Sequence, residues 1–185
     1  MQPFQEKNSR KNRAPVKNEQ VNEQVRKAFG RFGLLIACGL GAGLLPKAPG
    51  TFGTLLGVLV EVALFWLLDP AWRYPGLLSA FGLVCALSLA LLPLASKHFA
   101  SHDPKPFVLD EVAGYLLIPV VLANAHASVW RITLGFCLFR AFDILKPFPI
   151  GWVDRTLEGS LGVLLDDLLA GLFATLAILV LQYVL

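Results

Sequence analysis

FRAFDILKPFPIGWVDRTLEGSLGVLLDDLLAG, Phe139–Gly171, places a dense set of charges among apolar residues. Five of them are acidic and three are basic: Asp143, Asp154, Glu158, Asp166 and Asp167, with Arg140, Lys146 and Arg155. In a chain that is 56% hydrophobic, such charges must be solvated, paired or bound to a metal ion, because an uncompensated buried charge is costly. The stretch therefore predicts a polar site built into a hydrophobic scaffold.

The composition of the whole chain is typical of a membrane protein. Only 16% of its 185 residues are charged, whereas soluble domains carry about 25%. The length fits one domain. We therefore expect an all-α, polytopic membrane helical bundle. A soluble but unusually apolar helical protein is the alternative.

Basic residues concentrate near the start of the chain. Residues 1–33 contain eight Lys and Arg against three Glu, whereas the remainder contains eight against ten acidic residues. We expect a basic, polar and flexible arm over 1–32, which would meet anionic lipid headgroups, and a membrane domain over 33–185. We expect no cleavable signal peptide, because no apolar run follows Met1 at the usual distance.

Five apolar segments are expected to lie in or across the membrane as helices. They are residues 54–68, 76–95, 112–129, 132–145 and 161–184. The first and fourth are short for a hydrocarbon core of about 30 Å, so tilt or an interfacial position is expected. With the N-terminus in the cytoplasm, alternate threading places 1–53, 96–111 and 140–160 on the cytoplasmic side. These segments hold 14 of the 16 Lys and Arg, which agrees with the positive-inside rule.

Acidic residues occur in pairs where two apolar segments begin, at Asp110-Glu111 and at Asp166-Asp167. A negative charge at a helix N-terminus is favourable by only about 0.3–1 kcal/mol. That effect explains neither why the acids are doubled nor why Asp143 lies near the C-terminal end of its predicted helix. The pairs therefore indicate a site on the cytoplasmic face.

A glycine follows each acidic pair at helical spacing. Gly114 lies four residues after Asp110, and Gly171 lies four residues after Asp167. Each glycine thus shares a helix face with a carboxylate. Because glycine lets membrane helices approach closely, the two helices are predicted to bring their carboxylates to a common point. A third helix end, carrying Asp143, would complete the site.

An oxygen-only carboxylate cluster with few histidines suits Mg²⁺ or Mn²⁺. The neighbouring Arg140, Lys146 and Arg155 suit phosphate. We interpret the set as a site for phosphoryl chemistry on a lipid headgroup. Attack by water is the simplest route, because the chain lacks a Cys-x5-Arg loop, an Asp-x-Asp-x-Thr/Val stretch, a P-loop and the CDP-alcohol phosphotransferase pattern.

Two other classes of function stay open on the residues alone. The first is a small ion-coupled transporter that uses Glu61 and the paired acids. Transport sites lie near the membrane midplane, however, whereas these acids cluster at one predicted face. The second is a structural membrane protein whose acids merely begin helices.

Four blocks of the sequence carry a resemblance to a known family. They are GAGLLPKAPGTFGT at Gly41–Thr54, HDP at His102–Pro104 with VLDEVAG at Val108–Gly114, FRAFDILKPFPI at Phe139–Ile150, and DR at Asp154–Arg155 with GSLGVLLDDLLAG at Gly159–Gly171. In these blocks, which span about 130 of the 185 residues, the chain resembles the phosphatidylglycerophosphatase A family. It departs from the family in a Gly159-Ser160 pair, where two glycines are usual, and in its longer polar arm.

The resemblance implies a helical membrane phosphatase that needs Mg²⁺. Its reaction would remove the terminal phosphate of phosphatidylglycerophosphate and give phosphatidylglycerol. It would be a multi-pass protein of the bacterial cytoplasmic (inner) membrane, with its site facing the cytoplasm, where the substrate of the family is made. The expected partners are the phospholipid substrate and the lipid bilayer, and no nucleic acid is expected.

Five carboxylates are the expected metal ligands: Asp110, Glu111, Asp143, Asp166 and Asp167. The expected catalytic residues are Asp143, Lys146, Arg140, Asp154 and Asp103. Lys146 and Arg140 would hold the phosphate and stabilise the charge that develops on it; for Arg140 the alternative is a position at the membrane interface. Asp154 would bind the metal or orient water, with a salt bridge to Arg155 as the alternative.

The expected substrate-binding residues are Lys146, Arg140, Thr51, Gly50 and Arg155. Thr51 and Gly50 belong to a turn rich in Gly and Pro, whose backbone N–H groups suit a phosphate. Asp103 or the adjacent His102 would protonate the leaving glycerol oxygen. Glu61 is either a partner for a basic residue within the bundle or a protonated acid.

Overall fold

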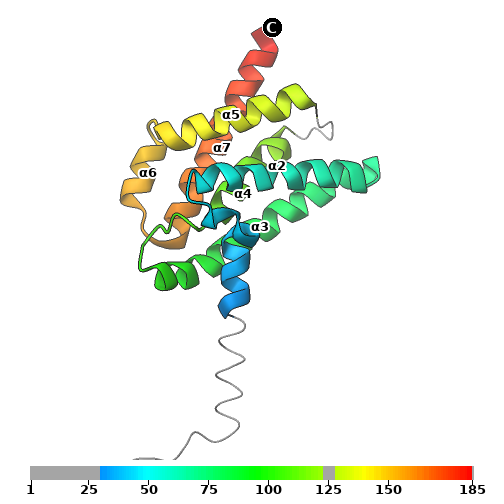
Figure 1. Cartoon of the computed structure of the whole chain (residues 1–185). Helices are drawn as coiled ribbons and strands as arrows, with labels where there is room; N and C mark the ends of the chain where they lie inside the picture. The colour runs from blue at the N-terminus through cyan, green and yellow to red at the C-terminus, as the bar shows by residue number, and fades with distance from the viewer. Residues whose placement is uncertain (1–29, 123–127, 185) are drawn as a thin grey trace, which may run out of the picture. The chain divides into compact units, whose positions relative to one another are not determined.

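The computed structural model of the chain describes residues 30–122 and 128–184 (Figure 1). The chain divides between Phe32 and Gly33 into two units, and the fold below is that of the second unit. The predicted flexible arm over 1–32 lies almost wholly outside the described residues, so it stays a prediction.

Every element of secondary structure in the described ranges is a helix, which confirms the predicted all-α class. The elements are η1 (Gly39–Leu44), α2 (Pro49–Leu67), α3 (Pro70–Phe99), α4 (Leu109–Val121), α5 (Val129–Leu145), α6 (Ile150–Thr156) and α7 (Gly159–Val184).

Three helices, α2, α3 and α7, are long and apolar enough to cross a membrane. The 13 residues of α4 extend only about 20 Å, well short of a hydrocarbon core of about 30 Å. The 17 residues of α5 are also few for a span. Five helices in or across the membrane were predicted, and within the described ranges three are long and apolar enough to cross it.

The predicted segment 112–129 differs most from the structure. α4 already begins at Leu109 and ends at Val121, and Ser128 has extended backbone before α5 begins. Apolar character runs through the whole segment, so hydropathy alone does not reveal where the helix ends. The second apolar segment, predicted over 76–95, also begins earlier in the structure, because α3 begins at Pro70 and proline is well tolerated in a first helical turn.

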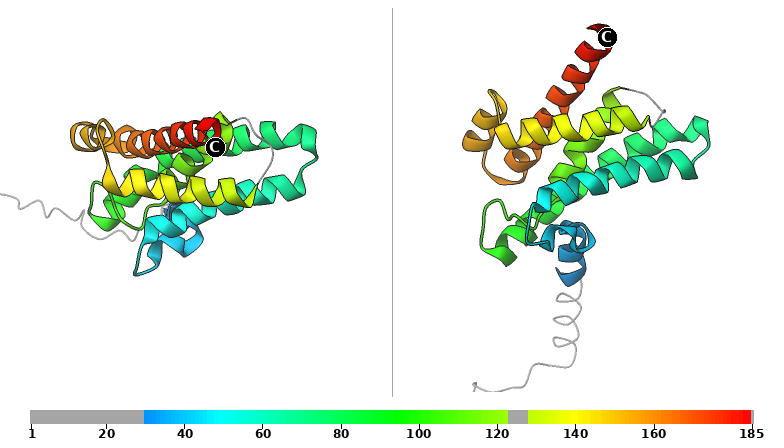
Figure 2. Two further views of the ribbon diagram at one scale, coloured as in Figure 1. Left: turned by 90° about the horizontal axis from the view of Figure 1, so that it is seen from above. Right: turned by 45° about the horizontal axis from the view of Figure 1, so that its top comes forward.

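The central helix of the bundle is α4. Ten of its residues are buried, and it packs against α7, α2, α3 and α5. The helices α2 and α3 form a hairpin that lies on one side of it, as Figure 2 shows. The bundle therefore surrounds α4 with longer helices, which explains how a short helix with two acids in its first turn can be buried.

Glycines allow α4 to approach two of its neighbours closely. A side-chain carbon at Gly114 would lie 2.7 Å from the backbone oxygen of Asp167, and one at Gly171 would overlap the backbone oxygen of Gly114. On the other side of α4, a side-chain carbon at Gly57 of α2 would lie 2.9 Å from the Tyr115 ring. The predicted close crossing of the two glycine-bearing helices is confirmed.

Candidate functional site

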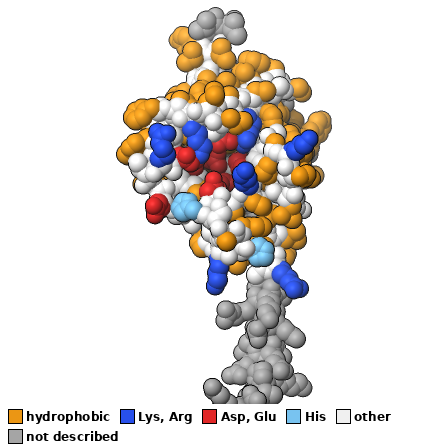
Figure 3. Space-filling view, turned by 60° about the vertical axis from the view of Figure 1, so that its left-hand side comes forward, with side chains coloured by type: hydrophobic (Ala, Val, Ile, Leu, Met, Phe, Trp, Pro, Cys, Tyr) orange, Lys and Arg blue, Asp and Glu red, His pale blue; other side chains and the backbone are white. Residues whose placement is uncertain are grey.

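A cavity of about 330 Å³ opens where α2, α4, α5 and α7 meet the 100–108 loop. Nine charged residues line it: Asp103, Lys105, Asp110, Glu111, Arg140, Asp143, Lys146, Asp166 and Asp167. Figure 3 shows acidic side chains gathered in a hollow, with basic side chains around them and hydrophobic side chains over much of the rest of this face. The cavity thus joins charges from four regions of the sequence.

Three carboxylates in this cavity lie close together. One oxygen atom from each of Asp110, Glu111 and Asp167 lies within 4.8 Å of the other two. The first two belong to the first turn of α4, and the third belongs to α7. They meet because the Gly114–Gly171 crossing brings these helices together one turn further along.

The environment of these carboxylates fits a bound cation. Asp110 and Asp167 are only 4% and 5% exposed, and the buried atoms Glu111 Oε2 and Asp167 Oδ1 have no hydrogen-bond partner within residues 30–122 and 128–184. Burial raises the pKa of Glu111 to about 8, and the charges of Asp167 and Asp143 add to this effect. Oxygen ligands that repel one another in a buried place can hold a metal ion.

Basic side chains from α5 complete the charged lining. Arg140 Nη1 lies 2.6 Å from Asp143 Oδ2, one turn away on the same helix. Lys146 Nζ donates hydrogen bonds to Asp154 Oδ1 and to Asp166 Oδ2, both at 2.6 Å. Lys146 thus connects the end of α5 to both α6 and α7.

The ammonium group of Lys146 keeps its charge in this setting. Burial alone would lower the pKa of Lys146, but its hydrogen bonds to Asp154 and Asp166 outweigh burial and hold the pKa above its ordinary value. Positive charge therefore remains at the wall of the cavity, next to the carboxylates. This juxtaposition suits a phosphate group bridged between a metal ion and basic side chains.

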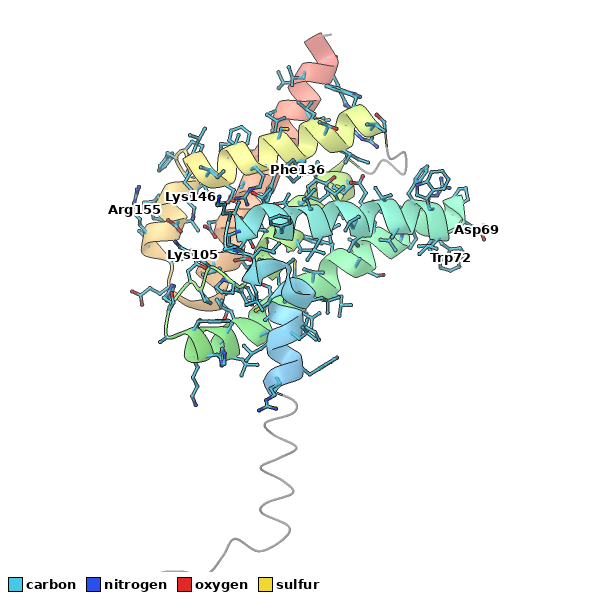
Figure 4. All side chains as sticks on the ribbon, in the orientation of Figure 1. Asp69, Trp72, Lys105, Phe136, Lys146 and Arg155 are labelled. Carbon is cyan, nitrogen blue, oxygen red and sulfur yellow. The ribbon has the colours of Figure 1, made fainter. Side chains whose placement is uncertain are left out.

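The structure gathers most, but not all, of the predicted site residues. Gly50 lines the cavity, whereas Thr51 is not among its lining residues. The Thr51 N–H already donates to the Ala48 carbonyl oxygen at 3.0 Å. Arg155 is exposed on α6 (Figure 4). Asp154 pairs with Lys146, and no ion pair between Asp154 and Arg155 occurs in the described part of the chain.

Two residues of the 100–108 loop have different surroundings. Asp103 lines the cavity, and its side chain is exposed. His102 Nε2 instead accepts a hydrogen bond from the Gly159 N–H at 2.7 Å, so this histidine ties the loop to the start of α7. Lys105, which was not among the predicted site residues, also lines the cavity. A lysine in a polar loop carries no pattern that would have indicated this.

A second polar cluster lies among α2, α4 and α5. The Tyr115 hydroxyl donates to Glu61 Oε2 at 2.6 Å, and both side chains are buried. With Arg131, which is 7% exposed, they line a separate cavity of about 10 Å³. Glu61 thus has a partner for its carboxylate within the bundle, apart from the larger charged cavity.

The fold and the cavity together define a class of protein: a helical membrane protein with a buried acidic group able to hold a metal ion, flanked by basic residues. Within that class, the chain belongs to the phosphatidylglycerophosphatase A family, whose model matches residues 35–182. The chain is therefore an enzyme, a phosphatase. No solved structure matches it significantly.

Three curated bacterial proteins illustrate this relationship. Phosphatidylglycerophosphatase A of Haemophilus influenzae is 37% identical over 151 residues, covering 80% of this chain and 88% of the relative. The Escherichia coli protein of the same name is 33% identical over 143 residues, covering 76% and 77%. A Bacteroides thetaiotaomicron protein named putative phosphatidylinositol-3-phosphatase is 33% identical over 154 residues, covering 82% and 94%.

Proposed function

We propose that the protein hydrolyses phosphatidylglycerophosphate to phosphatidylglycerol and inorganic phosphate, with Mg²⁺ as its cofactor. The observation that carries this proposal is the meeting of Asp110, Glu111 and Asp167 in the cavity that Arg140 and Lys146 also line. Carboxylates for a cation and basic groups for a phosphate are the two requirements of a phosphomonoester site.

Asp110, Glu111 and Asp167 would hold the ion, because the buried atoms Glu111 Oε2 and Asp167 Oδ1 have no hydrogen-bond partner among the described residues. When bound, the ion supplies positive charge that polarises the phosphoryl group. Asp143 and Asp166 were also predicted as ligands, and both line the cavity. They are paired with Arg140 and Lys146, so we assign them the role of orienting these two basic side chains.

The basic residues would bind and orient the phosphate. Arg140 presents a guanidinium group held by Asp143, and Lys146 presents an ammonium group held from two sides. Charges fixed before the substrate arrives stabilise the developing phosphoryl charge without reorganisation. Water would supply the attacking oxygen, which stays in the inorganic phosphate. Asp103 would donate a proton to the departing glycerol oxygen and would regain one from the attacking water.

The reaction would take place at the cytoplasmic face of the bacterial inner membrane, in a multi-pass protein. Three apolar helices support the membrane location. The cavity lining includes Lys105, Arg140 and Lys146, and basic residues are enriched on the cytoplasmic side of membrane proteins. Neither the family nor the relatives support the ion-coupled transporter.

Phosphate release from phosphatidylglycerophosphate in neutral detergent micelles, with and without Mg²⁺, tests the proposal. Wild type should release phosphate only with Mg²⁺, and Asp167→Asn should lose this activity by orders of magnitude. Asp69→Asn is the matched control, because Asp69 precedes α3 at the far end of the hairpin (Figure 4) and makes no capping hydrogen bond. Folded wild type without activity in any divalent cation, or a fully active Asp167→Asn protein, would refute the proposal.

A further inference from the structure

The 100–108 loop that forms one wall of the charged cavity is held in place by backbone contacts. The Phe107 N–H donates to the Pro104 carbonyl oxygen at 2.7 Å, and the Val108 N–H donates to the Ala37 carbonyl oxygen at 3.1 Å. The side chains of Phe107 and Val108 are 2% and 0% exposed. The loop is therefore anchored on its C-terminal side by burial as well as by hydrogen bonds.

The N-terminal side of the same loop has its own anchors. His102 Nε2 accepts from the Gly159 N–H at 2.7 Å, and the Ser96 hydroxyl donates to the His102 carbonyl oxygen at 3.1 Å. The loop thus has contacts to α3 and to α7. A residue between the two anchored sides has a defined place over the cavity, and Lys105 is such a residue.

Lys105 differs from the other two cations of the cavity lining. Arg140 is paired with Asp143, and Lys146 with two carboxylates. Lys105 takes part in none of the ion pairs between described residues, although its exposed side chain lines the same cavity. Figure 4 shows Lys105 and Lys146 on the same side of the bundle. The lining therefore includes one cation, Lys105, that forms no ion pair with a carboxylate of the described residues.

The proposed substrate carries a second phosphate group, a phosphodiester, to which the proposed function assigns no binding residue. Phosphatidylglycerophosphate has a terminal phosphomonoester, which is cleaved, and a phosphodiester, which joins the glycerol headgroup to the diacylglycerol. A cavity of about 330 Å³ is at the small end of ligand sites, so it suits a headgroup and not acyl chains. The proposed function assigns the phosphomonoester to Arg140, Lys146 and the cation that the carboxylates would hold.

We propose that Lys105 binds the phosphodiester of the lipid substrate and so selects phosphoinositide-like or glycerophosphate headgroups over a bare lipid phosphomonoester such as phosphatidic acid. This inference rests on the proposed function. The relatives' names refer to different headgroups, phosphatidylglycerophosphate and phosphatidylinositol 3-phosphate. Both lipids contain a phosphodiester beside a phosphomonoester, whereas phosphatidic acid contains only the monoester. A lysine that binds the phosphodiester would therefore contribute to the binding of either headgroup.

The test compares Lys105→Ala with wild type on two substrates, phosphatidylglycerophosphate and phosphatidic acid, in neutral detergent micelles. We expect Lys105→Ala to lower kcat/KM for phosphatidylglycerophosphate by about tenfold or more, chiefly through KM, because uniform binding is lost. Hydrolysis of phosphatidic acid should change less than about twofold. Lys105→Arg should keep most of the activity. Lys97→Ala is the matched control, because Lys97 is an exposed lysine at the end of α3 outside the cavity lining.

Product inhibition gives a second readout. It needs only the hydrolysis of phosphatidylglycerophosphate and not that of phosphatidic acid. In Lys105→Ala, inhibition by phosphatidylglycerol, which retains the diester, should weaken, while inhibition by inorganic phosphate should stay the same. Equal losses for both substrates, or unchanged inhibition by phosphatidylglycerol, would overturn the assignment of Lys105. If wild type releases no phosphate from either lipid, the proposed function itself has failed.

A phosphodiester could also come from neighbouring lipids and not from the substrate. In that case Lys105 would only attract the protein to an anionic surface, and the effect of Lys105→Ala would vanish in neutral micelles and grow when phosphatidylglycerol is added as a bulk component. That pattern contradicts the proposal. An effect that persists in neutral micelles and is confined to the diester-bearing substrate supports it.

Discussion

Gly50 in the first turn of α2 lies directly against the carboxylate of Glu111 on α4. A side-chain carbon at position 50 would overlap Glu111 Oε1 and would lie 2.9 Å from Arg140 Nη1. The backbone of α2 therefore forms part of the cavity wall and limits where the acid and the guanidinium can go. A glycine far from the acids in sequence thus sets the shape of the proposed metal and phosphate site.

We predict that Gly50→Ala raises the Mg²⁺ concentration for half-maximal activity by about tenfold or more, because the new methyl group displaces Glu111 and groups that orient metal ligands have effects of this size. Thr51→Ala is the control, since its neighbouring position is not part of the cavity lining. A Mg²⁺ titration of phosphate release checks both variants. An unchanged Mg²⁺ requirement in Gly50→Ala would remove Glu111 from the metal site.

The crossing of α4 and α7 leads to a prediction about stability as well as activity. Gly171→Ala places a methyl group against the Gly114 backbone oxygen, which cannot move as a side chain does. We expect a loss of about 1–3 kcal/mol, as for overpacked cores, together with reduced phosphate release, because Asp167 is pushed away from α4. Thermal unfolding in detergent measures the first effect.

Gly82→Ala on α3 is the matched control for that experiment. A side-chain carbon at Gly82 has no neighbour within 4 Å. The substitution should be neutral or stabilising by up to about 1 kcal/mol, because alanine is the better helix former. If Gly171→Ala behaves like Gly82→Ala, the close crossing of the two helices is not what holds the site together.

Removal of the Lys146 ammonium should affect both folding and catalysis. Lys146→Met leaves Asp166, whose side chain is 8% exposed, without its partner, and an unsatisfied buried group costs about 1–3 kcal/mol. Activity should fall by about 100-fold or more, as when a preorganised donor is lost. Thermal unfolding and phosphate release report these two effects separately.

A double substitution distinguishes the two roles of this lysine. Lys146→Met combined with Asp166→Asn removes both charges, so the double variant should recover part of the lost stability without recovering activity. Recovery of activity along with stability would show that Lys146 only supports the fold. Retained kcat with a raised KM in Lys146→Met would instead assign Lys146 to substrate binding alone.

The second polar cluster is predicted to serve the fold and not the reaction. Tyr115→Phe leaves Glu61 without its hydroxyl donor in a place where Glu61 is 8% exposed, so we expect a loss of about 1–3 kcal/mol. The kcat/KM of the folded protein should stay within about twofold of wild type, since neither residue lines the charged cavity. Tyr183→Phe, at a 96% exposed position, should change neither quantity. A selective loss of kcat in Tyr115→Phe would contradict this assignment.

Several parts of the fold and the cavity were predictable because local patterns determine them. The apolar segments predicted helices, and the structure confirms helices at each of them, although with shifted ends. The spacing of Asp110 to Gly114 and of Asp167 to Gly171 predicted that the two helices cross closely and bring their carboxylates together. The hydrophobic period and the spacing of residues on a helix face are properties of a short stretch of sequence, so they predict structure without knowledge of tertiary packing.

Other features depended on contacts that no local pattern contains. Hydropathy predicted five helices in or across the membrane, and only the helix ends show that three of those in the described part of the chain are long enough to cross it. Thr51 and Arg155 have residue types that suit phosphate, yet the lining of the cavity excludes them. The partner of Asp154 also depended on the fold, because Asp154 pairs with Lys146 from the end of α5.

By itself, the sequence determined that this is an all-helical, apolar chain with acids and glycines paired at one end of two helices, since composition and helical period need no tertiary information. Only the tertiary structure decided which charges share the cavity: Asp110, Glu111 and Asp167 meet within 4.8 Å, Lys146 reaches Asp166, and Lys105 faces the same space. The physical reason is that these contacts join residues far apart in the chain, and the packing of helices around α4 sets their distances.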